Sequence, residues 1–137
     1  MSGVVAGFED DLDAVVLGCP AVDLTALFVS NLPPLGRSHD RVMDMFERAG
    51  RMQMTASPLQ FEPAVDVDRL ALISAYADRM ADPVDQVGLL WEHWGRPEIR
   101  LVDTGHVTYF LNSEGPDALV ELLTDRGVVS AEGAQGG

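Results

Sequence analysis

The chain has 137 residues, 47% of them hydrophobic and 23% charged, a composition typical of one compact domain and unlike that of a disordered chain. Its formal net charge of −13, from 22 acidic and 9 basic residues, and the absence of any basic cluster argue against nucleic acid as a partner. No apolar run reaches the roughly 20 residues that a membrane span requires, and the N-terminus lacks a signal-peptide pattern. The single cysteine, Cys19, excludes an intramolecular disulfide, and its apolar neighbours indicate a buried thiol, so we expect a soluble, cytoplasmic protein.

The first third of the chain predicts one strand between two helical segments. Residues 2–8 are small and apolar, like the end of a helix. Residues 13–18 form a short apolar run between turn signals, which is typical of a strand covered on both faces of a parallel sheet. A short helix is expected around residues 24–29, before Pro33 and Pro34 forbid its continuation.

An amphipathic helix is predicted next, over residues 37–51, from apolar residues spaced three and four positions apart. Ser38 is expected to cap this helix and Gly50 to end it. Residues 52–66 are expected to be irregular.

The second half of the chain alternates strand and helix patterns. Strands are predicted at residues 68–76 and 97–102, and helices at residues 83–94 and 116–126, each helix followed by a glycine. Strands that alternate with helices through short connections indicate an α/β fold with about three parallel strands. We expect one domain over residues 1–130 and a flexible tail over residues 131–137.

Two polar residues follow successive predicted strands. Asp78 comes after the strand that ends at Ala77, and His106 comes after the strand at 97–102, across a tight loop that contains Gly105. Because functional groups in parallel sheets lie beyond the carboxyl ends of the strands, we expect the two side chains to meet. In that pair His106 would act as general base and then general acid, while Asp78 would hold the imidazole tautomer.

These segments resemble the C-terminal half of α/β-hydrolases. The resemblance rests on residues 76–83 as the acid loop, residues 90–97 as the helix and turn before the last strand, and the pair Gly105-His106. Residues 8–20 resemble the strand that follows the helix bearing the nucleophile. The resemblance implies that Asp78 and His106 are the acid and histidine of a catalytic triad, and that residues 21–63 form a cap-like insertion.

The nucleophile of that family is not found in the sequence. No G-x-S-x-G motif occurs among the 137 residues, and none of the serines follows a strand and precedes a helix as that motif requires. Cys19 follows a strand but precedes Pro20, which argues against a reactive thiol. Without a nucleophile or oxyanion-hole donors, we expect the chain to be inactive by itself.

Other polar residues have simpler interpretations. Asp82 is expected to cap the helix that starts at Pro83. His93 has no second histidine at the spacing of a metal site, and no metal or cofactor is predicted. Trp91 and Trp94 are expected to pack in the core.

Three functional hypotheses follow from the sequence. The first is a C-terminal fragment of a serine esterase or lipase-like α/β-hydrolase, which takes a small-molecule ester once the missing half completes it. The second is a non-catalytic interaction module that pairs its open sheet edge with another chain, as in a homo-oligomer. The third is one subunit of a split hydrolase, complemented by an N-terminal fragment.

Overall fold

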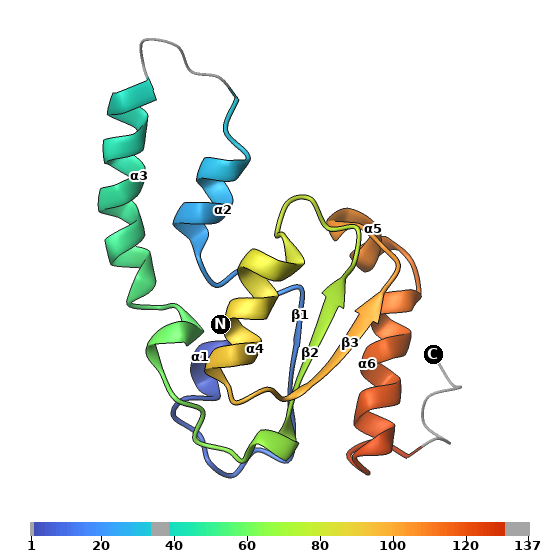
Figure 1. Ribbon diagram of the computed structural model, residues 1–137. Coiled ribbons are helices and arrows are strands. Elements are labelled where there is room, and N and C mark those ends of the chain that lie inside the picture. The colour runs from blue at the N-terminus through green and yellow to red at the C-terminus, as the bar shows by residue number, and fades with distance from the viewer. Residues whose placement is uncertain (1, 34–38, 131–137) are drawn as a thin grey trace.

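A computed structural model of the chain describes residues 2–33 and 39–130 and has an α/β fold (Figure 1). Its helices are α1 Ser2–Val5, α2 Leu24–Ser30, α3 His39–Met54, α4 Leu89–His93, α5 His106–Leu111 and α6 Glu114–Asp125. Its strands are β1 Val15–Gly18, β2 Leu70–Ala75 and β3 Glu98–Val102. Two single 3-10 turns, η2 Pro58–Gln60 and η3 Val67–Arg69, precede β2, and a π-helical segment, η4 Pro83–Gly88, leads into α4. The expected cap Ser38 and the expected flexible tail at 131–137 lie outside the described residues.

The three strands form a parallel sheet in the order β1-β2-β3, which confirms the predicted fold class. Pairing aligns Val15 with Leu70 in one ladder and Ala71 with Glu98 in the other. All six residues of β2 are buried, because this central strand has a neighbour on each side and helices over both faces. The sheet therefore places the carboxyl ends of β2 and β3 side by side.

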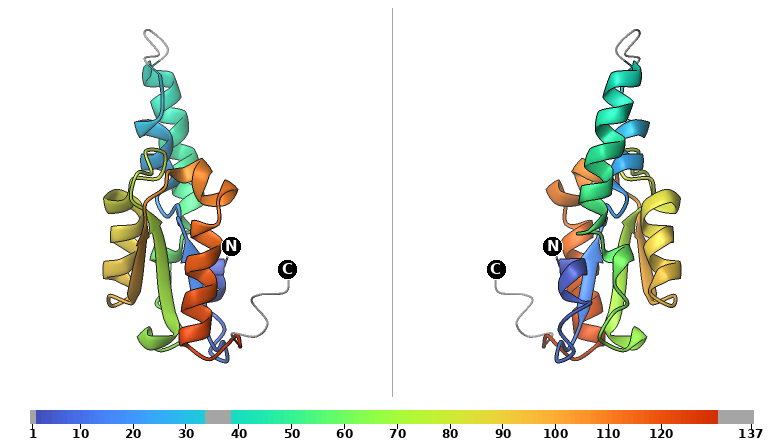
Figure 2. Two further views of the ribbon diagram at one scale, coloured as in Figure 1. Left: turned by 90° about the vertical axis from the view of Figure 1, so that its right-hand side faces the viewer. Right: turned by 90° about the vertical axis from the view of Figure 1, so that its left-hand side faces the viewer.

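Helices cover both faces of the sheet, with α4 on one side and α6 on the other (Figure 2). Alternate residues of β1 and β2 pack against α4 and α1 in one apolar cluster, whose members include Leu70, Leu72, Leu90 and Trp94. The intervening strand residues pack against α5 and α6 in a second cluster around Ile73 and Leu122. Trp94 is 3% exposed and the half-buried Trp91 packs against the first cluster, as expected for the two tryptophans.

Helices α2 and α3 form a hairpin that rises beyond the carboxyl end of β1 (Figure 1). The prediction that Gly50 ends α3 is wrong, since the helix continues to Met54. Gly50 is buried where α3 crosses α2, and a Cβ atom there would overlap the Thr25 side chain. The glycine is thus explained by the close approach of two helices rather than by a helix end.

A buried glutamine joins the hairpin to the helical layer of η4 and α4. Gln86 of η4 is 2% exposed, and its side-chain oxygen accepts hydrogen bonds from the backbone N–H groups of Val22 and Asp23, each at 2.9 Å. Its amide nitrogen donates to the Asp23 carbonyl at 3.1 Å. The Ser57 hydroxyl, also buried, donates to the Val22 carbonyl at 2.7 Å. The Gln86 bonds hold the start of the hairpin against the helical layer that carries α4, and the Ser57 bond ties the segment after α3 to the segment before α2.

In the part of the chain that the structure describes, no helix is long and apolar enough to cross a membrane.

Candidate functional site

Asp78 lies in a tight turn directly after β2. Its side chain is 2% exposed, and Oδ1 accepts hydrogen bonds from the backbone N–H groups of Met80 and Ala81, both at 2.8 Å. A carboxylate that accepts two backbone N–H bonds is held in one rotamer and satisfied on one oxygen. The other oxygen, Oδ2, is left to contact a different partner.

That partner is His106, whose Nδ1 lies 2.7 Å from Asp78 Oδ2. His106 is the first residue of α5, and its side chain is 26% exposed. A carboxylate on Nδ1 places the second ring nitrogen, Nε2, as the proton acceptor when the ring is neutral. The structure thus brings together the two residues that the sequence singled out.

Backbone hydrogen bonds tie the two loops to each other beyond the ends of the strands. The Tyr76 N–H donates to the Val102 carbonyl at 2.8 Å, and the Ala77 N–H donates to the Thr104 carbonyl at 3.0 Å. Within the histidine loop, the Gly105 N–H donates to the Thr108 hydroxyl at 2.8 Å. These bonds extend the β2–β3 pairing and hold the loops that carry Asp78 and His106 next to each other.

The acid loop also contacts the α2–α3 hairpin. The Asn31 side-chain amide, at the end of α2, donates to the Met80 carbonyl at 3.1 Å. The N–H group of the same residue, Met80, is one of the two that donate hydrogen bonds to Asp78 Oδ1. The hairpin can therefore influence the position of the carboxylate through one intervening residue, a link between residues 49 positions apart that the sequence pattern did not indicate.

Cys19 is a buried thiol, as the sequence predicted. It is 7% exposed and packs with Ala75 and Tyr109. Burial raises the pKa of the Cys19 thiol, a backbone hydrogen bond from Ala75 lowers it by less, and the charge of Asp78 raises it slightly further. A thiol with a raised pKa is a poor nucleophile at neutral pH because little thiolate is present.

The remaining candidates occupy structural positions. Asp82 caps η4 as predicted, and its Oδ1 accepts from the N–H groups of Val84 at 2.8 Å and Asp85 at 3.1 Å. His93 Nε2 lies 3.0 Å from the Phe61 carbonyl. Among the described residues, no three His, Cys, Asp or Glu side chains are grouped so that they could hold a metal ion.

Comparison with known proteins identifies relatives but no function. No model of a known protein family matches this chain. The chain is 32% identical over 136 residues to uncharacterized proteins from two strains of Mycobacterium tuberculosis, CDC 1551 / Oshkosh and ATCC 25618 / H37Rv. The match covers 98% of this chain but 32% of each relative, so the chain spans about a third of the length of these curated relatives.

Sequence reasoning missed a close contact beside the site. Gly18 ends β1, and a Cβ atom there would overlap the hydroxyl end of the Tyr109 side chain, which lies across the strand end. Tyr109 belongs to α5, three residues after His106, and burial raises the pKa of its hydroxyl. The apolar run at 107–111 was the available signal, and its five residues were too few to distinguish a helix from an extended segment.

Proposed function

We propose that Asp78 and His106 are the acid and the histidine of a serine-hydrolase triad of the α/β-hydrolase type, which cleaves carboxylic esters once a nucleophile is supplied. The observation that carries the proposal is the 2.7 Å contact between Asp78 Oδ2 and His106 Nδ1 at the carboxyl ends of two adjacent parallel strands. The order of acid before histidine in the chain, on neighbouring strands, agrees with that fold.

The chemistry assigned to the pair is proton transfer. His106 Nε2 would take the proton of a serine hydroxyl as it attacks the ester carbonyl, and would return it to the leaving alcohol. Asp78 would stabilise the imidazolium that forms in between, and its two backbone hydrogen bonds would keep the ring in the productive orientation. The α2–α3 hairpin within residues 21–63 would serve as the cap over the substrate.

The nucleophile must come from polypeptide outside the 137 residues, because they contain no G-x-S-x-G motif. The greater length of the M. tuberculosis relatives is consistent with this requirement. By itself the chain should not hydrolyse p-nitrophenyl acetate or react with a fluorophosphonate probe. Joined to the polypeptide encoded upstream of it, the chain should do both.

The test compares matched variants of the joined polypeptide. His106→Ala and Asp78→Asn should each lower kcat for p-nitrophenyl ester hydrolysis by about 10³-fold or more. Asp66→Asn, which lies outside the proposed cap and whose side chain makes no capping bond, should leave kcat unchanged. Turnover that survives in His106→Ala, or an upstream sequence with no G-x-S-x-G motif, would contradict the proposal.

A second candidate is a non-catalytic interaction module, which the open sheet edges favour. Within the described residues β1 and β3 each pair with one neighbour, so each leaves a row of backbone groups that another chain could extend. Sedimentation of the purified chain tests this candidate, since an interaction module of this kind should associate. A monomer that unfolds cooperatively argues against it.

A further inference from the structure

A side-chain amide of the α2–α3 hairpin bonds the same peptide group that holds Asp78. Asn31 Nδ2, at the C-terminal end of α2, donates to the Met80 carbonyl oxygen at 3.1 Å. The N–H of that peptide group is the N–H of Ala81, which donates to Asp78 Oδ1 at 2.8 Å. A continuous line of hydrogen bonds therefore runs from Asn31 through one peptide group to Asp78, and from Asp78 Oδ2 to His106 Nδ1 at 2.7 Å.

Hydrogen bonds in such a line strengthen one another. A peptide group whose carbonyl accepts a hydrogen bond is more strongly polarised, so its N–H becomes a better donor. The N–H of Met80 belongs to the preceding peptide group, which the Asn31 bond to the Met80 carbonyl does not polarise directly. Asn31 should thus act on the Ala81 donor more than on the Met80 donor, although both donate to the same oxygen of Asp78.

The hairpin, and not the acid loop, determines where Asn31 lies. Its backbone N–H closes the last turn of α2, and its side-chain amide also donates to the Leu27 carbonyl at 2.8 Å. Gln86 holds the other end of α2, at the segment before the helix begins. The bond from Asn31 to the Met80 carbonyl is therefore made only while the far end of α2 lies against the acid loop.

We propose that Asn31 is a positioning residue for the Asp78–His106 pair, through which the α2–α3 hairpin controls the orientation of the histidine. With the hairpin against the acid loop, the Asn31 bond completes the support of Asp78 Oδ1, and Oδ2 holds His106 in the Nδ1–H tautomer. With the hairpin moved away, the carboxylate loses part of that support. The inference rests on the proposed function where it treats the hairpin as a cap, but the state of the pair is measurable without catalytic activity.

The experiment compares Asn31 variants of the 137-residue chain by NMR. Asn31→Ala removes the bonds to Leu27 and Met80 together. Asn31→Ser retains a hydroxyl that bonds the Leu27 carbonyl one turn back, as serine side chains in helices commonly do, but is too short to reach Met80. In both variants the Ala81 amide proton should move upfield more than that of Met80, and should exchange with solvent about threefold to tenfold faster than in the wild type.

The second readout is the ring of His106, which a role confined to the end of α2 would not change. Above the pH at which the ring loses its proton, the ¹⁵N chemical shifts of Nδ1 and Nε2 report which nitrogen carries the hydrogen. We expect an Nδ1–H ring in the wild type, and a ratio of Nδ1–H to Nε2–H forms that falls about threefold in both Asn31 variants. His106→Gln assigns the signals among the three histidines.

The matched control is Asn112→Ala, which removes the asparagine at the end of α5, six residues after His106. It makes the same substitution at another helix end and should leave the Ala81 amide and the His106 ring unchanged. A change in the ring as large as that in Asn31→Ala would assign the effect to general loosening and overturn the proposal.

Two other results would also overturn it. A His106 ring that keeps its wild-type nitrogen shifts in both Asn31 variants would mean that Asn31 does not orient the histidine. An effect on Ala81 in Asn31→Ala but not in Asn31→Ser would assign it to the end of α2. Absence of esterase turnover in the joined polypeptide, by contrast, refutes the proposed function and leaves these measurements unaffected, whereas an Nε2–H ring in the wild type would refute the Asp78–His106 contact on which both proposals depend.

Discussion

At the residue scale, the carboxylate of Asp78 has two separable roles, one in folding and one in orienting His106. Asp78→Ala should lower the free energy of unfolding by about 2–4 kcal/mol, because it leaves the N–H groups of Met80 and Ala81 without their acceptor in a buried turn. Asp78→Asn retains an oxygen for those donors and should cost no more than about 1–2 kcal/mol. Urea denaturation of both variants measures the difference.

The two substitutions also separate folding from orientation. The asparagine amide can only donate to His106 Nδ1, which favours the opposite tautomer of the ring. Asp78→Asn should thus fold and still fail in catalysis. Equal loss of stability in the two variants would contradict the claim that the hydrogen bonds from Met80 and Ala81 account for the effect of Asp78→Ala.

The buried thiol of Cys19 should make the free energy of unfolding depend on pH. Its pKa is raised above the ordinary value of 9.0, so the folded state favours the neutral thiol. The contribution of Cys19 to stability is therefore complete below pH 9 and declines as the pH rises above 9 toward the folded-state pKa. The difference in unfolding free energy between the wild type and Cys19→Ala should be constant from pH 7 to 8 and smaller at pH 9.5.

The comparison between the two proteins isolates the thiol together with its influence on Tyr109. The pKa of Tyr109 is raised by burial and, to a lesser extent, by the charge of Cys19, so the burial effect cancels between the two proteins and the effect of Cys19 does not. A difference that stays constant or grows between pH 8 and pH 9.5 would mean that the thiol is not buried in the folded state.

Residue types at strand ends could be read from the sequence, but their hydrogen-bond partners could not. Asp78 and His106 were identifiable because each follows an apolar run, and parallel pairing of adjacent strands brings such positions together. The Asn31–Met80 contact depends on how helices lie over the sheet. That placement is set by packing, which a single sequence does not encode in its periodicity.

At the element scale, Gly50 provides a test of helix packing in the hairpin. Glycine to alanine within a helix normally stabilises a protein by up to about 1 kcal/mol. At Gly50 the new methyl group would overlap Thr25, so Gly50→Ala should instead destabilise the protein by about 1–2 kcal/mol in thermal or urea unfolding.

Two controls test whether the α2–α3 contact causes the loss of stability in Gly50→Ala. In a Thr25→Ala background the hydroxyl oxygen that causes the severe overlap is gone and only the Cβ atom of residue 25, at 3.0 Å, stays close, so Gly50→Ala should then cost much less stability. Gly88→Ala, at a helical glycine with space for a methyl group, should stabilise by about 0.5–1 kcal/mol in either background. Destabilisation by Gly50→Ala that is equally large in the Thr25→Ala background would contradict the packing argument.

Element boundaries show where sequence signals compete. Pro83 and Gly95 mark the ends of the helical region that contains η4 and α4, and Gly95 adopts the left-handed conformation (φ 76°) expected after a helix. The prediction that a glycine ends the helix is wrong at Gly50, because glycine is required both at helix ends and where two helices pack closely. The pattern alone does not say which requirement applies.

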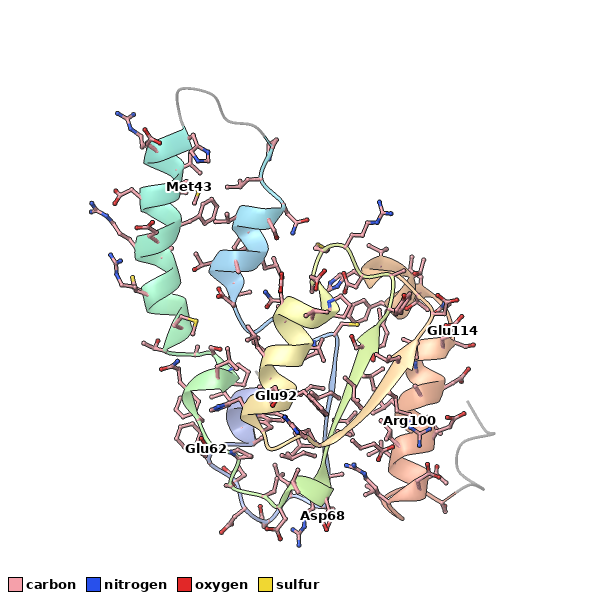
Figure 3. All side chains as sticks on the ribbon, viewed as in Figure 1. Met43, Glu62, Asp68, Glu92, Arg100 and Glu114 are labelled. Atoms are coloured by element: carbon pink, nitrogen blue, oxygen red, sulfur yellow. The ribbon has the colours of Figure 1, made fainter. Side chains whose placement is uncertain are left out.

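At the scale of the whole molecule, ion pairs are concentrated at one place while the net charge is spread widely. Arg100 of β3 lies on the side that faces α6 (Figure 3), where it pairs with Glu121 at 2.9 Å and with Asp125. It also contacts Glu98 at 3.1 Å, and the bond to Asp125, followed by that to Glu98, raises the pKa of its guanidinium. This group ties the edge strand to α6, but it neutralises only a small part of the acidic excess.

The chain has 22 acidic residues and only 9 basic ones, so repulsion between the carboxylates should limit the stability of the fold at low ionic strength. Raising NaCl from about 20 mM to about 300 mM shortens the Debye length from roughly 20 Å to roughly 6 Å, which screens repulsion between distant carboxylates. The exposed ion pairs, worth little each, lose less than the repulsion does. The Tm measured by circular dichroism should therefore rise by a few degrees.

A charge variant separates screening from other effects of salt. Asp10 and Asp11 are exposed and lie in the turn before β1, where neither makes an ion pair with another described residue. Asp10→Lys combined with Asp11→Lys should raise the Tm at 20 mM NaCl and reduce its increase at 300 mM. If the variant and the wild type gain equally from salt, or if the Tm of the wild type falls, general repulsion does not govern the stability of this fold, and the acidic residues must instead be balanced locally as Arg100 is.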